Sequence, residues 1–349
     1  MYTVGWVMPT IGHPNSVGSA GTAHPTTTPA QPASAIRNPQ SAIEKQTVIV
    51  VVGAEGTPEY AVQFAKSADL WEQACAKSGA KFITIGFDEN EGTSDRASLQ
   101  EILAKQSEQT ATALWLVLIG HGTYDGRAAK FNLRGPDISA GDLAEWLKPM
   151  QRPVAVINTA SASAPFLKEL SSPGRTVITA TKSGFEQNLT RFGRHFAEAV
   201  IDSRADLDKD GQTSLLEAFL SASHAVSEFY SAAGRLTTEH ALLDDNGDGL
   251  GTPAEWFRGI RPVQKARDDA ALDGYRAHQL HLLHSAGETA MPPDLRARRD
   301  QLELQVMELR DTRAPLSEEE YFSKLEPLLR EIARIYEQSE GRDSSGQSR

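Results

Sequence analysis

Disulfides, an excess of basic residues and long hydrophobic runs are all missing from this sequence. Its 349 residues include one cysteine, Cys75, which excludes an intramolecular disulfide and a cysteine-rich zinc site. Lysine and arginine total 35 against 46 aspartate and glutamate residues, for a net charge of −11. This balance argues against nucleic-acid binding and is compatible with cation binding. No apolar run reaches the roughly 18 residues of a membrane span, so we expect none.

The two ends of the chain lack hydrophobic periodicity. Residues 1–45 are rich in proline, threonine, serine, alanine and glycine, a composition that buries too little apolar surface to offset the entropy of ordering. We therefore expect a disordered tail there and a second one at 339–349. The first residues also lack the basic start and compact apolar stretch of a signal peptide. Localisation stays open, because a different true start would allow an export signal.

Short apolar runs alternate with amphipathic stretches between residues 46 and 200. Continuous apolar strands are typical of a parallel sheet covered on both faces, and strand–helix alternation indicates βαβ units. The sequence therefore predicts an α/β domain with a doubly wound, mostly parallel sheet. The expected strands are Thr47–Val52, Lys81–Gly86, Leu114–Ile119, Val154–Ile157 and Arg175–Ala180, and the expected helices include Tyr60–Lys77, Ser98–Glu108 and Ala140–Leu147.

Two acidic loops within residues 201–260 have the spacing of calcium ligands. Asp206–Glu217 carries oxygen-bearing side chains at positions 1, 3, 5, 9 and 12 and a glycine at position 6, and Asp244–Glu255 repeats the pattern. A loop around a hard cation needs inward-facing oxygens at alternate residues, a glycine for the sharp turn and a final glutamate. The pattern resembles a pair of EF-hands. It predicts a tandem EF-hand-like helical module at 201–260 that binds Ca²⁺.

The predicted ligands combine carboxylates, an amide, backbone carbonyls and hydroxyls. They are Asp206, Asp208, Asp210, Gln212 (through its carbonyl), Ser214 (through a water) and Glu217 in the first loop, and Asp244, Asn246, Asp248, Leu250 (through its carbonyl), Thr252 and Glu255 in the second. Thr213 and Gly251 stand at position 8, where EF-hands carry an aliphatic residue, which predicts loose pairing and reduced affinity. The simpler alternative is two solvated acidic turns. If calcium binds, a structural role is the plainer expectation, because binding adds to stability, and a regulatory role is the alternative.

A histidine marks the end of a central predicted strand. His121 lies between two glycines after Leu114–Ile119, and residues 158–163 (Asn-Thr-Ala-Ser-Ala-Ser) follow the next strand. Residues 179–184 at the end of the neighbouring strand are also mostly small and polar. Open α/β sheets place their sites at the carboxyl ends of strands, so the sequence predicts a site at this edge.

The run Ile-Gly-His-Gly at 119–122, the strand order and the run at 158–163 resemble the caspase/legumain-type (clan CD) cysteine peptidases. In that family one apolar strand ends in a His-Gly pair, and the following strand ends in the nucleophilic cysteine. The resemblance implies that His121 is the catalytic histidine and that the Gly122 amide helps to form the oxyanion hole. The position of the cysteine falls on Ala160, which has no nucleophile.

Three interpretations follow from Ala160. In the favoured one the chain is a pseudoenzyme, a peptidase-like scaffold that binds calcium and a peptide or protein ligand. In the second, Ser161 or Thr159 replaces the thiol in a calcium-dependent peptidase or hydrolase, with His121 as general base and Asp125 or Asn158 as the orienting group. In the third, the resemblance is accidental. Cys75 lies in an earlier predicted helix and does not replace the missing thiol.

Residues 261–338 are helical in pattern and strongly charged. Apolar residues recur at helical spacing on both sides of Thr312–Pro315, which predicts two helices in an antiparallel hairpin. Pro327 indicates that the second helix starts or kinks there. Because no site-like cluster lies in this segment, we interpret it as a packing or dimerisation arm.

Overall fold

The computed structural model describes residues 45–87, 93–107, 112–268 and 270–346. The predicted disordered tail at 1–45 therefore lies almost wholly outside the described residues, as do the last three residues of the tail predicted at 339–349.

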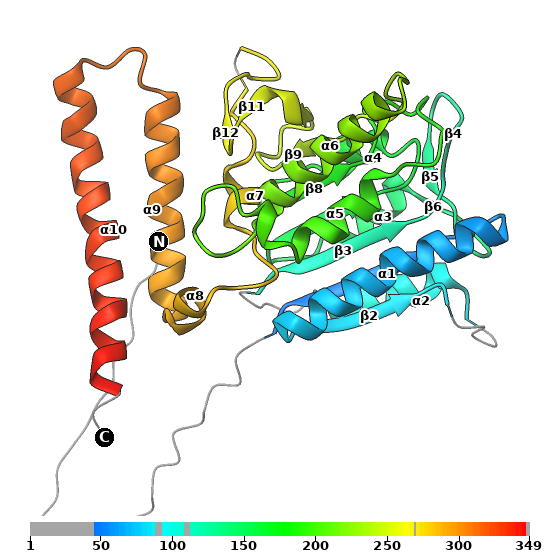
Figure 1. Cartoon of the computed structure of the whole chain (residues 1–349), viewed down its shortest axis with the longest axis horizontal. Helices are drawn as coiled ribbons and strands as arrows, with labels where there is room; N and C mark the ends of the chain where they lie inside the picture. Colours follow the sequence, from blue (N-terminus) through cyan, green and yellow to red (C-terminus); the bar gives the residue numbers. More distant parts are fainter. Residues whose placement is uncertain (1–44, 88–92, 108–111, 269, 347–349) are drawn as a thin grey trace, which may run out of the picture. The chain divides into compact units, whose positions relative to one another are not determined.

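A seven-stranded sheet forms the centre of the described chain, in the order β10-β9-β8-β7-β3-β1-β2 (Figure 1). The strands β2, β1, β3, β7 and β8 are all parallel. This arrangement confirms the predicted doubly wound, mostly parallel α/β fold. The strands are β1 (Thr47–Val52), β2 (Lys81–Ile85), β3 (Leu114–Ile119), β7 (Val154–Asn158), β8 (Arg175–Thr179), β9 (Leu242–Asp244) and β10 (Thr252–Pro253).

Helices cover both faces of this sheet, as the continuous apolar strands require. The alternation of side chains along β1 shows the two faces: Val48 and Val50 belong to the core under the first group of helices, and Ile49 and Val51 to the core under the second. The first group comprises α1 (Pro58–Ser78), α5 (Phe192–Val200) and α6 (Leu215–Ala232), and the second comprises α2 (Asp95–Lys105), α3 (Ala140–Leu147) and α4 (Ala164–Leu170).

A small three-stranded sheet follows β3 directly and was not predicted. It contains β4 (Gly122–Tyr124), β5 (Ala129–Phe131) and β6 (Ile138–Ser139), paired antiparallel in that order. The strands are two or three residues long, too short for an alternation pattern to reveal them. Because β4 begins at Gly122, this sheet fixes the chain just after His121.

The second acidic loop differs from the prediction, because it joins two strands and not two helices. It connects β9 to β10, which pair antiparallel, and β9 pairs with β8 of the main sheet. Leu243 in β9 is fully buried opposite Ile178, so burial of this short apolar pair adds a strand where a helix was expected. Residues 201–260 are therefore not a separate helical module. Only the first loop is flanked by helices, with α5 and the short 3₁₀ helix η1 (Ser203–Ala205) before it and α6 after it.

The C-terminal segment confirms the predicted antiparallel hairpin, formed by α9 (Pro293–Asp311) and α10 (Glu318–Gly346). Pro327 lies inside α10, so the helix starts nine residues earlier than a start at Pro327 would allow. The helix also continues through most of the predicted tail at 339–349, because each residue added to an established helix gains a backbone hydrogen bond. Between β10 and the hairpin lie η2 (Ala254–Trp256), β11 (Phe257–Arg258), β12 (Arg261–Pro262), α7 (Tyr275–Gln279) and α8 (Ala286–Ala290).

No helix in the described part of the chain combines the length and the apolar character that a membrane crossing needs.

Candidate functional site

His121 lies at the predicted edge of the sheet, just beyond the end of β3. Its Nε2 is 3.3 Å from the backbone oxygen of Glu55. The imidazole ring packs edge-on against two rings of α1, with centroid distances of 4.8 Å to Tyr60 and 5.3 Å to Phe64. Among the described residues, no hydrogen bond joins His121 to Ser161 or Thr159.

Ser161 is bonded to the backbone of Gly122 and not to the histidine. The Gly122 amide donates to Ser161 Oγ at 3.1 Å, and Ser161 Oγ donates to the Gly122 carbonyl at 3.2 Å. Ser161 is buried. The backbone amide that the family resemblance assigns to an oxyanion hole therefore already has an acceptor within the chain.

Thr159 is likewise committed to the backbone. Its buried hydroxyl donates to the carbonyl of Leu118 in β3 at 2.8 Å. Neither suggested orienting group is hydrogen-bonded to His121 in the described part of the chain: Asp125 accepts from two amides in its own turn, and Asn158 accepts from the amide of Ala160. No triad-like arrangement is present among these residues.

The turn at Ala160 is tight and buried. Ala160 and Ala162 are both about 1% exposed, and Ala162 has a φ of 53°, in the left-handed region. A non-glycine residue there costs on the order of 1–2 kcal/mol. The amide of Ala162 donates to the carbonyl of Glu186 at 2.8 Å, which contributes to holding this conformation.

Cys75 lies on α1 and is buried in the core. Burial is the main cause that raises the pKa of its thiol to about 12, and Glu72 adds to the effect. Because the thiolate is the reactive form of cysteine, this side chain is an inert core residue.

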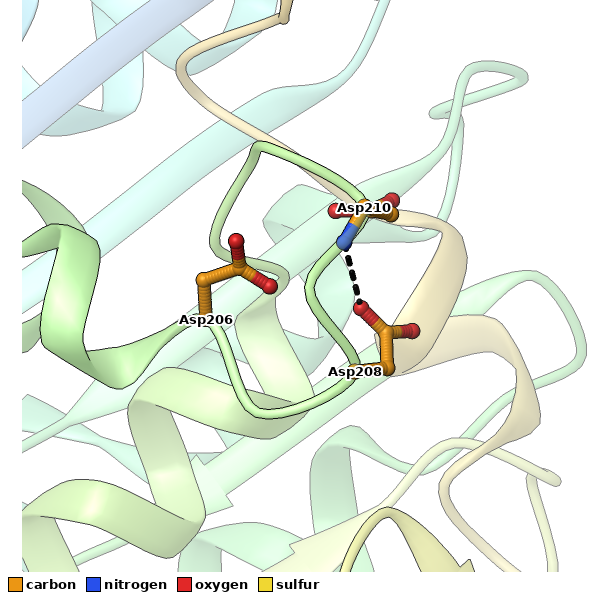
Figure 2. Close-up of side chains that lie close together, drawn as sticks. All are labelled: Asp206, Asp208 and Asp210. Carbon is orange, nitrogen blue, oxygen red and sulfur yellow. Dashed lines mark hydrogen bonds between the residues drawn. The ribbon is translucent and has the colours of Figure 1, made fainter.

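The first acidic loop folds around its own aspartates. Asp206 accepts hydrogen bonds from the amides of Lys209 (2.7 Å) and Gly211 (3.2 Å), and Asp208 accepts from the amide of Asp210 (3.2 Å; Figure 2). One oxygen from each of these three aspartates lies within 4.8 Å of the others. Three close carboxylates repel one another unless a cation or protons neutralise them. This oxygen-only donor set fits a hard cation such as Ca²⁺.

The second loop repeats this hydrogen-bond pattern position by position. Asp244 accepts from the amides of Gly247 (2.9 Å) and Gly249 (2.8 Å), and Asn246 accepts from the amide of Asp248 (2.8 Å). At position 5, Asp210 and Asp248 each accept from the amide two residues further on. The two loops therefore have the same internal turn, although helices flank the first loop and strands flank the second.

Backbone angles confirm that the two turns match. At position 4 the φ angles are 66° for Lys209 and 84° for Gly247, and at position 6 they are 90° for Gly211 and 74° for Gly249. All four lie in the left-handed region that favours glycine. Lys209 is the only one of these four residues that carries a side chain.

The two terminal glutamates are placed differently from the prediction. Glu217 Oε2 accepts from the amide and the hydroxyl of Ser214 (both 2.8 Å) in the capping box of α6, and its Oε1 accepts from the amide of Leu207 (2.7 Å). It is not part of the group of three aspartates. Glu255 is exposed in η2, and in the described chain Asp244, Asp248 and Glu255 form no such group.

Two buried carboxylates, those of Asp245 and Asp273, lie beside the second loop, and the sequence analysis did not predict them. Asp273 accepts from the amide of Asp245 at 3.0 Å and from the hydroxyl of Thr252 at 2.6 Å. Burial, followed by the charge of Asp245, raises the pKa of Asp273 to about 9. Burial also raises the pKa of Asp244 above its usual value. Thr252, which was predicted as the ligand at position 9, therefore donates its hydroxyl to Asp273 of this pair.

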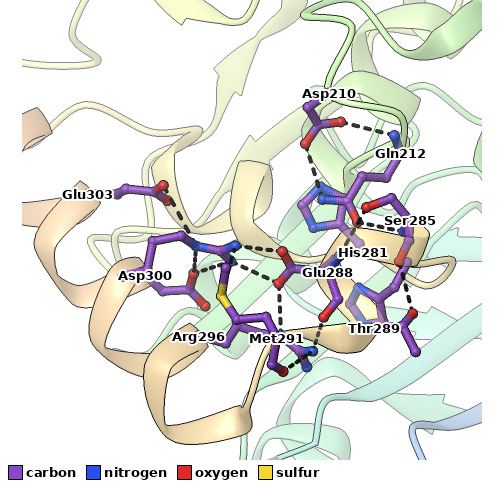
Figure 3. A network of polar contacts seen from close by, with 12 residues as sticks. Asp210, Gln212, His281, Ser285, Glu288, Thr289, Met291, Arg296, Asp300 and Glu303 are labelled. Atoms are coloured by element: carbon purple, nitrogen blue, oxygen red, sulfur yellow. Dashed lines mark hydrogen bonds and ion pairs between the residues drawn. The ribbon is translucent and has the colours of Figure 1, made fainter. Parts of the chain in front are cut away.

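A polar network connects the first loop to the C-terminal hairpin (Figure 3). Gln212 Nε2 donates to Asp210 (3.1 Å), and Gln212 Oε1 accepts from the amide of Ser285 (3.1 Å). Ser285 caps α8 by accepting from the amide of Glu288 (3.2 Å), and Glu288 is ion-paired to Arg299 of α9 at 2.5 Å. The residues of this network are too far apart in the sequence to be predicted as a group.

His278 is a further partner of the first loop that sequence spacing did not indicate. Its Nε2 lies 2.9 Å from Asp208 Oδ2, although the two residues are 70 positions apart. Leu250, predicted to contribute its carbonyl, lies in the turn of the second loop, where its amide donates to Asp248. Ser214, predicted to contribute through a water, is the N-cap of α6.

Comparison with known proteins gives structural likenesses only. The chain is similar to the crystal structure of the Drosophila initiator caspase Dronc (13% identity, TM-score 0.40, covering 58% of this chain and 80% of that one). It is also similar to caspase-1 from Spodoptera frugiperda (10% identity, TM-score 0.38, covering 58% and 86%). No family model and no curated protein matches the sequence. These likenesses concern the fold and say nothing of activity.

Proposed function

We propose that this protein binds calcium through its two acidic loops and is a peptidase-like scaffold without a peptidase nucleophile. The observation that carries the calcium proposal is the common turn of the two loops, which have the same four kinds of side chain-to-amide hydrogen bond. Two sequence matches that arose by chance would not be expected to have the same backbone conformation, because one loop lies between helices and the other between strands.

The first loop is the stronger candidate site. Asp206, Asp208 and Asp210 bring three carboxylates together, and a divalent cation would relieve their repulsion. Glu217 Oε1 accepts from the amides of Leu207 and Asp208 in this loop, while its Oε2 makes the capping bonds to Ser214. The second loop has one carboxylate fewer at these positions, because Asn246 replaces an aspartate. We therefore assign the first loop the higher affinity.

The role of calcium in this proposal is structural. The first loop is bonded to α8 and α9 through Gln212, Ser285 and Glu288. The second loop lies at the end of the main sheet, where β9 pairs with β8. Cation binding at either loop would stabilise elements that are already packed.

The proposal that peptidase chemistry is lost depends on the residues at the carboxyl edge of the sheet. Ala160 has no nucleophile, and the hydroxyls of Ser161 and Thr159 are buried and bonded to backbone groups. The alternative, a calcium-dependent hydrolase, requires one of these hydroxyls to be within reach of His121. The hydrogen bonds of the described residues do not support it.

A peptide or protein ligand remains the proposed partner of this edge. Phe185 is 74% exposed and contacts Tyr124 of β4 edge-on, with ring centroids 5.3 Å apart. Exposed aromatic side chains of this kind are common anchors in protein–protein contacts. Phe185→Ala should weaken capture of such a ligand without changing calcium binding.

Thermal unfolding with calcium or with chelator tests the calcium proposal. We expect calcium to raise the melting temperature of the wild-type protein, because a ligand at about 100 times its dissociation constant adds about 2.7 kcal/mol. Asp206→Asn and Asp244→Asn should each reduce the shift. Asp69→Asn, an exposed change on α1, should leave it intact. An equal shift in all four proteins would show that calcium acts elsewhere.

A further inference from the structure

The two acidic loops are not bonded to each other directly. In the described part of the chain, no hydrogen bond or β-bridge joins residues 206–217 to residues 244–255. Thr213 and Gly251, which stand at position 8 of the two loops, form no bridge with each other. A polar connection between the loops therefore runs through a third part of the chain. The bridging segment, residues 273–281, makes this connection and contains α7.

One end of the bridging segment is bonded to the second loop. Asp273 accepts from the amides of Asp245 (3.0 Å) and Asn246 (3.3 Å), at positions 2 and 3 of that loop. In return, Asp245 accepts from the amides of Gly274 (2.9 Å) and Ala277 (2.7 Å) at the start of α7. Asp245 and Asp273 are each 1% exposed. These reciprocal bonds attach the start of α7 to the backbone of the second loop.

The other end of the bridging segment is bonded to the first loop. His278 Nε2 lies 2.9 Å from Oδ2 of Asp208, at position 3 of that loop. The carbonyl of Leu280 accepts from the amide of Leu215, at position 10, at 2.7 Å. The loop residue before Leu215 forms an antiparallel β-bridge with the residue after Leu280. The segment therefore contacts the same two regions, near positions 3 and 10, that calcium binding would order.

Helix α7 depends on these bonds for its conformation. It has five residues, of which only Ala277 is buried, and a helix much shorter than about 12 residues is not stable on its own. The first amides of a helix also need acceptors from outside it, and Asp245 supplies both of the bonds described above. Loosening of either loop should therefore loosen α7 and, through it, the other loop.

We propose that the bridging segment couples the two acidic loops, so that calcium bound at one loop raises the affinity of the other. This inference rests on the proposed calcium binding. Calcium at the first loop fixes Asp208, which holds His278, and the segment then holds the amides of the second loop through Asp273. The second ion meets a loop that is already ordered, so it binds with a smaller loss of conformational entropy. By thermodynamic linkage, the two loops raise each other's affinity by the same factor.

Calorimetric titration of the full chain with calcium measures the coupling. The product of the two binding constants of the wild-type protein is divided by the product of the single constants of Asp206→Asn and Asp244→Asn, and independent loops give a ratio of one. We expect a ratio of at least about five, the lower end of typical coupling. Two occupied sites with a ratio of one overturn the coupling and leave calcium binding intact. A wild-type protein that binds no calcium overturns both proposals.

Variants of His278 test the route of the coupling. The ratio is measured again with His278→Ala added to all three proteins, which cancels direct effects of the change on one loop. His278→Ala should lower the ratio toward one, whereas His278→Gln, whose amide still donates to Asp208, should keep most of it. His224→Ala, at an exposed histidine of α6, should leave the ratio unchanged. An undiminished ratio in His278→Ala overturns the proposed route.

Hydrogen exchange gives a second readout that does not depend on the His278 variants. In Asp244→Asn only the first loop is expected to bind calcium, yet the amides of Gly274 and Ala277 are bonded to Asp245 of the second loop. Calcium should nevertheless slow the exchange of these two amides in this variant. Exchange that calcium leaves unchanged there, in a variant that still binds one calcium ion, overturns the coupling through the bridging segment.

Discussion

The Gly122 amide and the Ser161 hydroxyl bond to each other across the ends of two neighbouring strands, with the amide donating at 3.1 Å and the hydroxyl donating to the carbonyl of the same glycine at 3.2 Å. Gly122 follows β3 and Ser161 follows β7, and these strands are adjacent in the sheet. A side chain that satisfies both backbone groups of one residue serves to hold two loops together. This pair is the main reason to assign Ser161 a structural role.

Ser161→Ala should therefore lower stability without removing an activity. Loss of the hydroxyl leaves part-buried backbone groups of Gly122 without their partner, at a cost of about 1–2 kcal/mol. Urea unfolding measures this cost, with Ser231→Ala on the exposed side of α6 as the neutral control. A fluorogenic peptide panel run with calcium should show no cleavage above the His121→Ala protein. Cleavage that Ser161→Ala abolishes would restore the hydrolase interpretation.

Cys75 should resist alkylation in the folded protein. Its burial and its pKa of about 12 leave almost no accessible thiolate at neutral pH. Mass spectrometry after iodoacetamide treatment should show an unmodified chain under native conditions and one added group in denaturant. Rapid modification of the native protein would contradict the packing of α1 described above.

Calcium should protect α8, which precedes the hairpin, from hydrogen exchange. The first loop bonds to the Ser285 amide through Gln212 Oε1, so a loop ordered by calcium should hold that bond more often. Exchange at residues 285–291 should slow when calcium is added. Gln212→Ala should abolish the slowing and keep calcium binding, because the predicted ligand at this position is the backbone carbonyl. Equal slowing in the variant would mean that the connection runs through other contacts.

Asp142 should contribute its full stabilisation above about pH 4 and lose it progressively at lower pH. The Arg96 guanidinium, which binds Asp142 at 2.8 and 2.9 Å, is the main cause that holds the pKa of this carboxyl well below its usual value, and Ser139 adds to it. Since the folded state favours the charged form, the stabilisation is fully present above the unfolded pKa and is lost progressively as the pH falls from there through the lower folded pKa.

The matching variant is Asp142→Asn, which we expect to cost about 1–2 kcal/mol at pH 7, since the pair is partly exposed. The difference between variant and wild type should shrink as the pH is lowered through 4. Glu145→Gln, on the same helix but with a more exposed carboxylate, should change stability little. A difference that stays constant down to pH 2.5 would exclude the Asp142 charge as its source.

The centre of the main sheet was predictable because the strands β1, β3 and β7 are buried on both faces. Runs such as Leu114–Ile119 and Thr47–Val52 are wholly apolar, and the structure buries every residue in them. The strand β9 escaped prediction because three residues next to an acidic loop carry no periodicity. Two calcium-like loops in tandem instead predict a helical, EF-hand-like module over 201–260.

The candidate sites were predictable to the extent that they are local in sequence. Asp206, Asp208 and Asp210 lie together because alternate residues of one loop face inward. The partners His278 and Asp273 come from distant segments, and only the packing of the chain brings them to the loops. The bonds of Ser161 to Gly122 depend on the register of two strands, which spacing alone does not give.

Calorimetric titration with calcium tests the central claim most directly. The account predicts two binding sites in the wild-type protein, one of higher affinity, and one remaining site in each of Asp206→Asn and Asp244→Asn, with the tighter site lost in the first variant. The double variant should bind no calcium, while Asp69→Asn keeps both sites. A wild-type protein without measurable calcium binding, or a double variant with both sites intact, would contradict the account.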